Sequence, residues 1–399
     1  MTLALRPYQE EGRDFLASRR VALLADEMRV GKTPQAILAA HKAGAKSILV
    51  VTRAIAVRQW EEELYRWWPD VNGPRYKVLS FERATSWWQS GATGTIDVFI
   101  PDECHFAKNP AALRTQMVYG KTGFASRAGA VWPLSGTPAP KHAGELWPML
   151  TAFGAIKMTP FEFEEHFCTR DWTGRAIGTK IDRIPELREI IYRYTLRRTR
   201  KQVAPDMPDI DFQFLNVDAP GVDIGPETRA AFDAGRETFD SEDRVAVAMA
   251  KAGPLAQEVA FAIGKGLLRQ TVVFGWHREP LEQVNRQLYD MQIRSRLLYG
   301  GQSDRERQQT MDDFRDGRLS VICANILAAG TAIDLSAADH GFFLELDWVS
   351  GNNAQAANRL ISMQKSTGVS FDVATMPGTV DDRIQKVLLR RVAELARLI

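Results

Sequence analysis

The chain contains a tripeptide, Gly31-Lys32-Thr33, whose residue types match the chemistry of a phosphate-binding loop. Glycine lets the backbone approach an oxyanion closely, lysine can reach terminal phosphates, and the threonine hydroxyl can bind Mg²⁺. The apolar run Val21–Ala25 enters this turn and a helical pattern leaves it, which is the context that such a loop requires. The strict pattern has glycine five residues before Gly31, where this chain has Asp26, so the flanking elements carry the prediction.

An acidic pair supplies the second half of this chemistry. The apolar run Ile96–Pro101 ends at Asp102 and Glu103. Asp102 at a strand end can bind Mg²⁺ directly or through water, and Glu103 can accept a proton from an attacking water molecule. An isolated Asp-Glu pair is far more often a solvated surface pair. Because this pair follows an apolar strand downstream of Lys32, it predicts that the protein hydrolyses a nucleoside triphosphate.

The elements that must position these residues alternate along the first half of the chain. Short apolar or β-branched runs are separated by helix-length segments such as Val57–Trp68. The predicted strands are Val21–Ala25, Ser47–Thr52, Ile96–Pro101 and Val131–Ser135. This alternation is typical of a parallel sheet with helices on both faces. It ends near Tyr194–Lys201, and we expect a first domain over residues 1–205.

The second half resumes this alternation after a stretch that is rich in proline, aspartate and glycine. We expect residues 206–225 to form an inter-lobe linker or crossover, although Phe212–Val217 could also be a strand. A largely helical stretch, Glu227–Arg269, follows. The predicted strands of this half are Thr271–Gly275, Ser295–Tyr299, Ser320–Ala324, Gly341–Leu346 and Val369–Ala374. The sequence thus predicts an α/β fold of two similar lobes, the second over 226–399, with a cleft between them.

Composition limits the class of protein. A chain of 399 residues, 45% hydrophobic and 25% charged, is typical of a soluble two-domain protein. No run of eighteen apolar residues predicts a membrane span, and the N-terminus has a charge at residue 6 and no cleavage site of a signal peptide. Three scattered cysteines without metal-binding spacing favour a reduced, cytoplasmic protein that has no structural metal.

Net charge and tryptophan content bear on nucleic-acid binding. A net charge of +2 argues against a uniformly basic binding surface but permits a local basic groove. The ten tryptophans include two adjacent pairs, and we interpret these residues as packing groups rather than base-stacking groups. Composition alone therefore neither requires nor excludes a nucleic acid as a partner.

Longer segments around these residues resemble the motifs of superfamily II helicases, and specifically those of Swi/Snf-type ATPases. Asp102–His105 resembles motif II, Asp26–Met28 resembles the start of motif I in this branch, and the basic segment Leu196–Lys201 is specific to the same branch. Further matches follow in the family order: Leu5–Gln9 (adenine-reading segment), Ile48–Trp60 (motif Ia), the extension of motif II to Pro110, Leu134–Pro138 (motif III), Gly301–Arg307 with Phe314 (after motif IV), Ala328–Leu335 (motif V) and Gln355–Arg359 (motif VI). The resemblance covers nearly the whole chain. It implies two tandem RecA-like lobes with the ATP site in the cleft between them.

The resemblance also assigns residues to a site for ATP and Mg²⁺, with Gln9 on the adenine base. The implied nucleotide-binding residues are Arg6, Gln9, Met28, Arg29, Val30, Gly31, Lys32, Thr33, Gly330 and Asp334. The metal ligands are expected to be Thr33 and Asp102. The catalytic residues are expected to be Lys32, Asp102, Glu103, Gln355 and Arg359.

Further residues are assigned to coupling of the lobes and to nucleic acid. His105 is expected to link hydrolysis to the other lobe together with Ser135 and Thr137 of motif III. Candidate nucleic-acid contacts are Thr52, Arg53, Arg197, Arg198 and Thr331. The basic residues Arg193, Arg197, Arg198, Arg200 and Lys201 could instead form a solvated helix face. The sequence does not choose between DNA and the acids of the ATP site as their partners.

Two of the departures from the family pattern bear on the nucleotide site. The second arginine of motif VI, usually the arginine finger, falls on Ser362. Because such a finger is worth roughly 10³-fold or more in rate, either Lys365 substitutes, or the alignment slips, or turnover is slow. Arg29 stands where the family usually has glycine, and it could add charge near the phosphates or point to solvent.

Three functions are compatible with these motifs. The leading hypothesis is a DNA-dependent ATPase that couples hydrolysis to lobe closure and so moves along, or remodels, double-stranded DNA. The alternatives are a strand-separating DNA or RNA helicase and a slow ATP-gated clamp on DNA. We expect a compact monomer without the accessory domains of chromatin remodellers, which another protein could recruit. It is expected to act in the cytoplasm, in the host's cytoplasm if it is phage-encoded, and in the nucleus only if it is eukaryotic.

Overall fold

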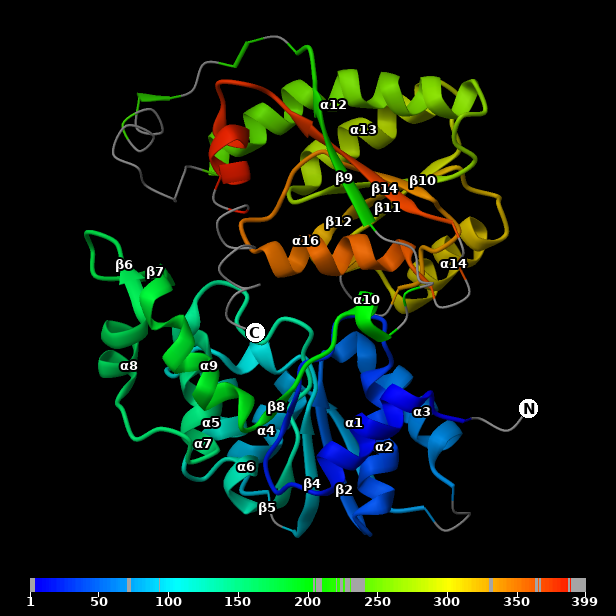
Figure 1. Cartoon of the computed structure of the whole chain (residues 1–399). Coiled ribbons are helices and arrows are strands. Elements are labelled where there is room, and N and C mark those ends of the chain that lie inside the picture. Colours follow the sequence, from blue (N-terminus) through cyan, green and yellow to red (C-terminus); the bar gives the residue numbers. More distant parts are fainter. Residues whose placement is uncertain are drawn as a thin grey trace. The chain divides into compact units, whose positions relative to one another are not determined.

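The computed structural model describes residues 4–69, 73–92, 94–203, 205, 210–219, 221–222, 225–226, 230, 241–329, 333–362, 365, 367–386 and 388 (Figure 1). The chain divides into two compact units between residues 205 and 206. Each unit contains a parallel sheet with helices on both faces, which confirms the predicted α/β class. Within those ranges, no helix combines the length and the apolarity that a membrane crossing requires.

Unit 1 is built on parallel strands. They are β1 (Leu23–Leu24), β2 (Ser47–Thr52), β3 (Arg75–Ser80), β4 (Ile96–Pro101), β5 (Ala128–Val131) and β8 (Thr195–Leu196). The order β3-β2-β4-β5 forms one sheet, and β1 pairs with β8. Parallel bridges from Val21 to Val131 and from Leu24 to Leu134 join the two sets. The strand that enters the phosphate-binding loop therefore lies among strands that run in the same direction.

Successive side chains of β2 and β4 enter two different apolar cores, one on each face of the sheet. One core takes Leu49, Val51 and Phe99, and the other takes Val50 and Ile100. Because both faces are covered, these strands are continuously apolar, which is why the sequence predicted them with the observed bounds.

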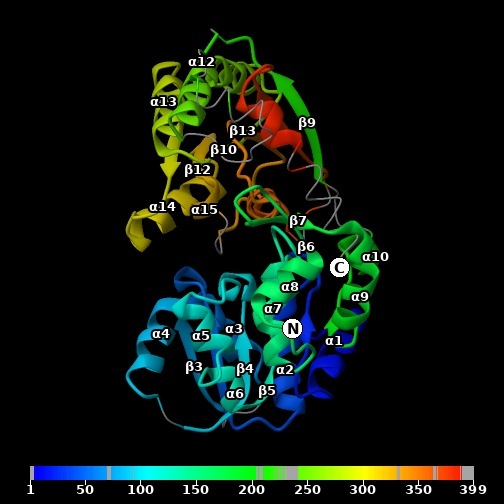
Figure 2. The same cartoon turned by 90° about the vertical axis from the view of Figure 1, so that its left-hand side faces the viewer.

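The helices of unit 1 cover this sheet and carry one small hairpin. They are α1 (Pro7–Ala17), α2 (Lys32–Lys42), α3 (Val57–Trp67), α4 (Phe81–Gln89), α5 (Leu113–Tyr119), α6 (Phe124–Arg127), α7 (Trp147–Ala152), α8 (Pro160–Phe167), α9 (Ile184–Tyr192) and α10 (Arg200–Val203), with 3₁₀ helices η1 (Ala54–Ala56), η2 (Cys104–Ala107), η3 (Ala143–Leu146) and η4 (Ile181–Arg183). The antiparallel strands β6 (Cys168–Arg170) and β7 (Ala176–Thr179) form a hairpin beside α8 (Figure 2). This hairpin was not predicted from the sequence.

Unit 2 has a six-stranded sheet in the order β11-β12-β10-β13-β14-β9, and every pairing is parallel. Its elements are β9 (Ile210–Asn216), α12 (Ser241–Gly264), β10 (Thr271–Gly275), α13 (Arg278–Asp290), β11 (Ser295–Leu298), α14 (Asp304–Arg315), β12 (Val321–Asn325), α15 (Ile326–Ala329), β13 (His340–Phe343), α16 (Ser350–Ala357), η5 (Asn358–Leu360) and β14 (Val369–Thr375). Helices α12 and α13 share one core with the sheet, and α14 and α16 share the other.

The segment expected as a linker contributes a strand instead. Residues 210–216 form β9, which pairs with β14 over its whole length, from Ile210 with Val369 to Asn216 with Thr375. The alternative that Phe212–Val217 is a strand is therefore the correct one. Phe212 stacks on Phe371, with ring centroids 5.3 Å apart, so aromatic packing holds this edge strand on the sheet.

We predict that Gly341→Ala destabilises unit 2. A Cβ at Gly341 would lie 2.4 Å from Cε1 of Phe371, whose ring is fully buried. Overpacking of this kind costs about 1–3 kcal/mol, so the free energy of unfolding in urea should fall by that amount. Gly264→Ala is the control, because a Cβ there meets no atom within 4 Å. Equal stability of the two variants would contradict the prediction.

Candidate active site

The phosphate-binding loop lies between β1 and α2, and two of its residues have a left-handed backbone. Gly31 precedes the first turn of α2 with φ of +78°, and Arg29 has φ of +67°. A Cβ at Gly31 would lie 2.4 Å from Nε2 of Gln9, so both conformation and space favour glycine. The φ of Arg29 explains the family's glycine at this position, since a larger residue costs about 1–2 kcal/mol there. The first N–H groups of α2, which include that of Thr33, have no intrahelical acceptor and can bind an anion.

Lys32 lies close to both acidic residues of the predicted catalytic pair. Its Nζ donates hydrogen bonds to the carbonyl oxygens of Asp26 and Glu27, at 2.8 and 3.1 Å. Loss of hydration lowers the pKa of Lys32, and the charges of Glu103, Asp26 and Asp102 oppose that shift. The loop and the acidic pair, which are far apart in the sequence, are therefore neighbours in the fold.

The start of α1 packs against the same loop. Tyr8 Oη and Gln9 Nε2 both donate hydrogen bonds to the carbonyl oxygen of Val30, at 3.0 and 3.1 Å. The backbone N–H of Arg6 donates to Oε1 of Gln9 at 2.9 Å, which orients the amide. Gln9 thus contacts the phosphate-binding loop, and its contact with the adenine base stays a prediction.

Asp26, where the strict loop pattern has glycine, forms a buried ion pair with Arg198. Asp26 is fully buried, and Nε and Nη2 of Arg198 donate to its Oδ1 and Oδ2 at 3.0 and 2.5 Å. Nη2 also donates to Oε1 of Gln35 at 2.9 Å, and Nη1 donates to the carbonyl oxygen of Tyr8. Gln35 Nε2 donates in turn to the carbonyl oxygen of Gly31 at 3.0 Å. One guanidinium group therefore connects the loop with both α1 and α2.

The rest of the basic segment lies along the loop as well. Nη1 of Arg197 donates to the carbonyl oxygens of Ala25 and Gly136, at 3.3 and 3.1 Å. The backbone N–H of Arg200 donates to Oε2 of Glu27 at 2.7 Å. The nucleic-acid contacts predicted at Arg197 and Arg198 do not fit this geometry, because both guanidinium groups are bound inside unit 1. The alternative, contact with the acids of the loop, is the one that the structure supports for Arg198.

Asp102, at the end of β4, is held by two hydrogen bonds. Thr52 Oγ1 and Trp60 Nε1 both donate to its Oδ2, at 2.9 and 2.8 Å. Loss of hydration and the neighbouring charge of Glu103 raise the pKa of Asp102 to about 6. Thr52 is fully buried, which corrects its predicted role as a nucleic-acid contact. The role of Trp60 was missed, although the motif Ia match ends at this residue.

Glu103 presents a carboxylate oxygen toward His105 and the site. Its backbone is left-handed, with φ of +50°, a strained conformation of the kind found at active sites. Oε2 lies 3.4 Å from Nδ1 of His105 and, within the described parts of the chain, has no hydrogen-bond partner. A buried oxygen of this kind is suited to accept a proton from a bound water molecule.

His105 connects the acidic pair to motif III. Its Nδ1 lies 3.0 Å from Oγ of Ser135, and that hydroxyl accepts a hydrogen bond from the backbone N–H of Thr137 at 3.1 Å. Burial lowers the pKa of His105 to about 3, so the imidazole is neutral. Gly136 of motif III also packs closely against the phosphate-binding loop, since a Cβ at Gly136 would lie 3.1 Å from Cγ of Met28. Motifs II and III are therefore in contact, and the role of His105, Ser135 and Thr137 in coupling the lobes stays a prediction.

Arg53, predicted to contact nucleic acid, lies at the start of η1. Its guanidinium carbon is 4.9 Å from the ring centroid of Phe106, within the segment that follows the acidic pair. This cation–π contact places Arg53 next to motif II. The structure therefore shows where Arg53 lies, and its contact with nucleic acid stays a prediction.

The candidate residues of unit 2 that the structure describes lie around α16 and η5. Gln355 is buried, and its Nε2 has no hydrogen-bond partner among the residues described. The carbonyl oxygen of Arg359 accepts a hydrogen bond from the N–H of Leu335 at 3.0 Å, so motifs V and VI are adjacent. Asp334 is exposed and accepts a hydrogen bond from the N–H of the following Ser336. Gly330 and Thr331 lie outside the described residues.

Lys365 does not fit the role of a substitute finger for Ser362. Its side chain is 8% exposed, and Nζ lies 2.7 Å from Oδ1 of Asp339. Nζ also donates to the carbonyl oxygens of Ser336 and Leu360, at 3.0 and 3.1 Å. Because its ammonium group is bound by these partners inside unit 2, Lys365 does not supply the positive charge that an arginine at position 362 would supply.

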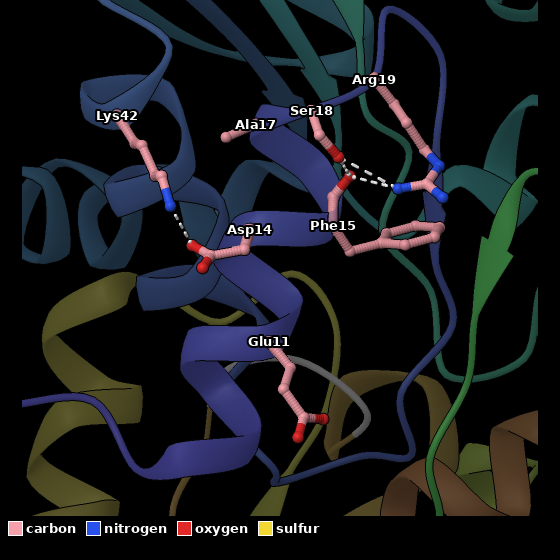
Figure 3. Close-up of a pocket in the computed structure, with 7 residues that line it drawn as sticks. All are labelled: Glu11, Asp14, Phe15, Ala17, Ser18, Arg19 and Lys42. Atoms are coloured by element: carbon pink, nitrogen blue, oxygen red, sulfur yellow. Dashed lines mark hydrogen bonds and ion pairs between the residues drawn. The ribbon is translucent and has the colours of Figure 1, made fainter.

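A hollow on the outer face of α1 and α2 is distinct from this site (Figure 3). Lys42 Nζ lies 2.8 Å from Oδ1 of Asp14, and Nη1 of Arg19 donates to the backbone carbonyl oxygen of Phe15 at 3.2 Å. Hydrogen bonds from Arg13 and Lys42 lower the pKa of Asp14 to about 2. These contacts leave the hollow without the features of a nucleotide site.

Comparison with known proteins identifies the family. Residues 76–220 match the SNF2-related domain, and residues 258–364 match the helicase conserved C-terminal domain. The chain belongs to the SNF2-related ATPases of helicase superfamily II, as the motif resemblance implied. The two parallel α/β units correspond to the two RecA-like lobes expected of that family.

Two relatives of this chain are considerably longer than it is. The DNA annealing helicase and endonuclease ZRANB3 of Mus musculus is 25% identical over 435 residues, which cover 97% of this chain and 40% of that protein. The SWI/SNF-related matrix-associated actin-dependent regulator of chromatin subfamily A-like protein 1 of Xenopus laevis is 26% identical, over 98% of this chain and 44% of that protein. The Sulfolobus solfataricus SWI2/SNF2 ATPase core in complex with dsDNA is 18% identical with a TM-score of 0.47, over 99% of this chain and 92% of that one. The chain thus spans less than half the length of these two named relatives.

We predict that Arg198→Ala destabilises unit 1 far more than the removal of an exposed arginine from the same segment. The variant leaves the carboxylate of Asp26 buried without its charge partner, which costs about 3–5 kcal/mol in comparable sites. Urea unfolding should show that loss, with nucleotide affinity falling as well. Arg193→Ala is the control, because Arg193 is exposed. If the two variants unfold at the same urea concentration, the ion pair does not have the role assigned to it.

Proposed function

We propose that this chain is a DNA-dependent ATPase that hydrolyses ATP with Mg²⁺ and uses the energy to move along, or remodel, double-stranded DNA. The observation that carries the proposal is that the loop of Lys32 adjoins Asp102 and Glu103, because Leu24, in the strand before the loop, and Asp102 both form parallel bridges to Leu134. These residues follow the carboxyl ends of β1 and β4, the edge at which open parallel sheets bind their ligands. Membership of the SNF2-related family supports the same chemistry.

The acidic pair fits a magnesium ion beside a triphosphate. Both side-chain hydrogen bonds to Asp102 fall on Oδ2, which leaves Oδ1 as an oxygen ligand of the kind that Mg²⁺ prefers. The hydroxyl of Thr33, in the first turn of α2, would be the other protein ligand. When bound, the ion would supply positive charge to the phosphate oxygens.

Other groups of unit 1 bind the phosphates and accept the proton of the attacking water. The N–H groups at the start of α2 bind phosphate oxygens, and Lys32 exchanges its contacts with the loop carbonyls for contacts with the terminal phosphates. Glu103 accepts the proton of the attacking water at Oε2. The neutral imidazole of His105 lies 3.4 Å from that oxygen and 3.0 Å from Oγ of Ser135, so it stands between the general base and motif III.

Duplex DNA is the substrate that the sequence motifs favour. Asp26–Met28 and Leu196–Lys201 resemble the duplex-tracking branch of the superfamily. Two relatives bear names that refer to a DNA annealing helicase and to a regulator of chromatin. The proposal includes Arg53 as a contact to the DNA backbone, and a chain that acts as a cytoplasmic monomer. A strand-separating helicase is the alternative that stimulation by single strands would support.

A slow ATP-gated clamp on DNA is the second candidate, and one observation favours it. Ser362 replaces the second arginine of motif VI, and Lys365 is bound to Asp339 and to backbone carbonyls. Without a cation from this segment, charge that develops on the phosphate is less well stabilised. Such a chain would hold DNA in the ATP-bound state and turn over slowly.

We predict that Glu103→Gln abolishes hydrolysis but preserves ATP binding. Removal of a general base slows the chemical step by about 10²- to 10⁴-fold, whereas the phosphate-binding loop is left intact. ATP turnover should be measured without nucleic acid and with duplex DNA, single-stranded DNA and RNA, and nucleotide binding with a fluorescent ATP analogue.

ATP turnover by the wild-type chain should be stimulated most strongly by duplex DNA. Glu82→Gln, which alters an exposed carboxylate on α4, should behave as wild type. Hydrolysis that persists in Glu103→Gln would show that another group is the base. Hydrolysis that no nucleic acid stimulates would contradict the proposed function.

We predict that Ser362→Arg raises the turnover number in the presence of saturating duplex DNA, because it restores the second arginine of motif VI. A finger contributes roughly 10³-fold elsewhere, so even a partial gain should be visible in steady-state kinetics. Gly368→Arg adds the same charge at an exposed position and serves as the control. An unchanged rate in Ser362→Arg would mean that this position does not limit hydrolysis.

A further inference from the structure

Unit 2 presents a surface, at the amino ends of its strands, that the nucleotide motifs do not occupy. Motifs V and VI follow the carboxyl ends of β12 and β13, whereas three loops enter the sheet at the opposite edge. They join α12 to β10, α13 to β11 and α14 to β12, over residues 265–270, 291–294 and 316–320. These amino-edge loops are not part of the site described above.

Hydrogen bonds connect the amino-edge loops with one another. The buried side chain of Gln270 donates from Nε2 to the carbonyl oxygens of Phe314 and Leu319, at 2.5 and 2.9 Å. The carbonyl oxygen of Arg294 accepts a hydrogen bond from the N–H of Ser320 at 2.8 Å. The three loops therefore form one preorganised surface, and a ligand that binds there does not have to order them first.

Two arginines of the amino-edge loops have no acidic partner. Nη2 of Arg294 donates to the carbonyl oxygen of Gly317 at 3.4 Å, and Nη2 of Arg269 lies 3.5 Å from the place that a Cβ on Gly317 would take. Both arginines are exposed, and among the residues that the structure describes no carboxylate lies at ion-pair distance from either guanidinium group. Two positive charges that no acid neutralises are thus held at one turn.

The amino-edge loops carry net positive charge. They contain four basic residues, Lys265, Arg269, Arg294 and Arg318, and one acidic residue, Asp316. Nη1 of Arg318 lies 2.9 Å from Oδ2 of Asp316, so that acid is already paired. The exposed Lys265 and the two arginines without an acidic partner set the charge of this surface, which therefore favours an anionic ligand.

Large apolar side chains lie among these charges. Leu267 is 68% exposed, Met291 is 38% exposed, and Tyr289, in the last turn of α13, is 76% exposed. The next residues inward, Leu268 and Ile293, pack in one apolar core, so the loops that carry Leu267 and Met291 are neighbours. Tyrosine, methionine and arginine are the residues that protein interfaces favour, and a phosphate backbone offers no partner for aliphatic side chains. The combination fits a protein segment better than a nucleic acid.

We propose that the amino-edge loops of unit 2 bind an acidic, amphipathic segment of a partner protein, with carboxylates on Arg269 and Arg294 and apolar side chains on Leu267 and Met291. The inference goes beyond the proposed function, because it concerns recruitment of the chain and not hydrolysis or movement. The loops lie at the edge of the sheet opposite to motifs V and VI, so the docking surface is separate from the nucleotide motifs of unit 2.

The test measures binding of defined peptides to the full chain by fluorescence anisotropy, without nucleotide. The first probe is a labelled synthetic peptide that combines glutamate and leucine in a helical pattern, and the second has alanine in place of each leucine. The wild-type chain should bind the leucine peptide about fivefold more tightly than the alanine peptide.

Two sets of substitutions separate the charged and apolar contributions. Reversal of both charges, by Arg269→Glu together with Arg294→Glu, should weaken binding of the leucine peptide about tenfold or more, because two attractions become repulsions. Leu267→Ser should weaken it about fivefold, because the apolar contact is lost. Arg83→Glu is the matched control, since it reverses an exposed arginine on α4 of unit 1, and it should bind the peptides as the wild type does.

Blunt duplex DNA should bind the double variant and the wild type equally. A loss of DNA binding in the double variant would overturn the proposal and assign the loops to nucleic acid. Self-association of the wild type that the double variant lacks would overturn it too, and would assign them to a second copy of this chain.

Equal affinity of the wild type and the double variant for the leucine peptide would also overturn the proposal, as would a wild-type chain that binds neither peptide or does not distinguish them. The comparison of two peptides on the wild type requires no substitution, and urea unfolding checks that each variant is folded. Because the titrations contain no nucleotide, their outcome is independent of whether DNA stimulates hydrolysis.

Discussion

The buried ion pair between Asp26 and Arg198 is the interaction on which the active site depends. A carboxylate with no exposed surface is stable only when it is paired and hydrogen-bonded. Arg198 meets that demand with two nitrogens and uses the rest of its guanidinium group to bind Gln35 and the backbone of Tyr8. One side chain thus connects α1, α2 and the loop between β1 and α2. The ion pair gives this loop a defined shape at Asp26, the position at which the strict phosphate-binding pattern has glycine.

The groups around the loop fall into two sets. On the inner side, Arg197 and Arg198 bind the loop and hold it in place. At the carboxyl edge of the sheet, Lys32 and Glu103 are available for a nucleotide, since Lys32 is bound only by loop carbonyls among the contacts that the structure describes. Thr52 and Trp60 orient Asp102 from the adjacent elements, and His105 continues the set into motif III. The same scaffold that satisfies the buried charges thus positions the reactive ones.

Much of this arrangement could be predicted from the sequence, and the exceptions have physical reasons. β2 and β4 are buried on both faces, so their apolar runs gave the correct bounds. The β6–β7 hairpin buries only its base, so it leaves no apolar run to detect. Arg198 was misassigned because a basic residue attracts a phosphate or a carboxylate equally, and its partner lies 172 residues away. Contacts of that range depend on the folded topology, which local patterns do not contain.

A double-mutant cycle on nucleotide binding tests the role of the ion pair most directly. Asp26→Asn, Arg198→Gln and the double variant would each be titrated with a fluorescent ATP analogue. Each single substitution leaves one member of the pair unsatisfied, so the double variant should bind ATP no worse than either single variant, with a coupling energy of about 1–3 kcal/mol. Additive losses, with no coupling between Asp26 and Arg198, would contradict the idea that this pair shapes the phosphate-binding loop.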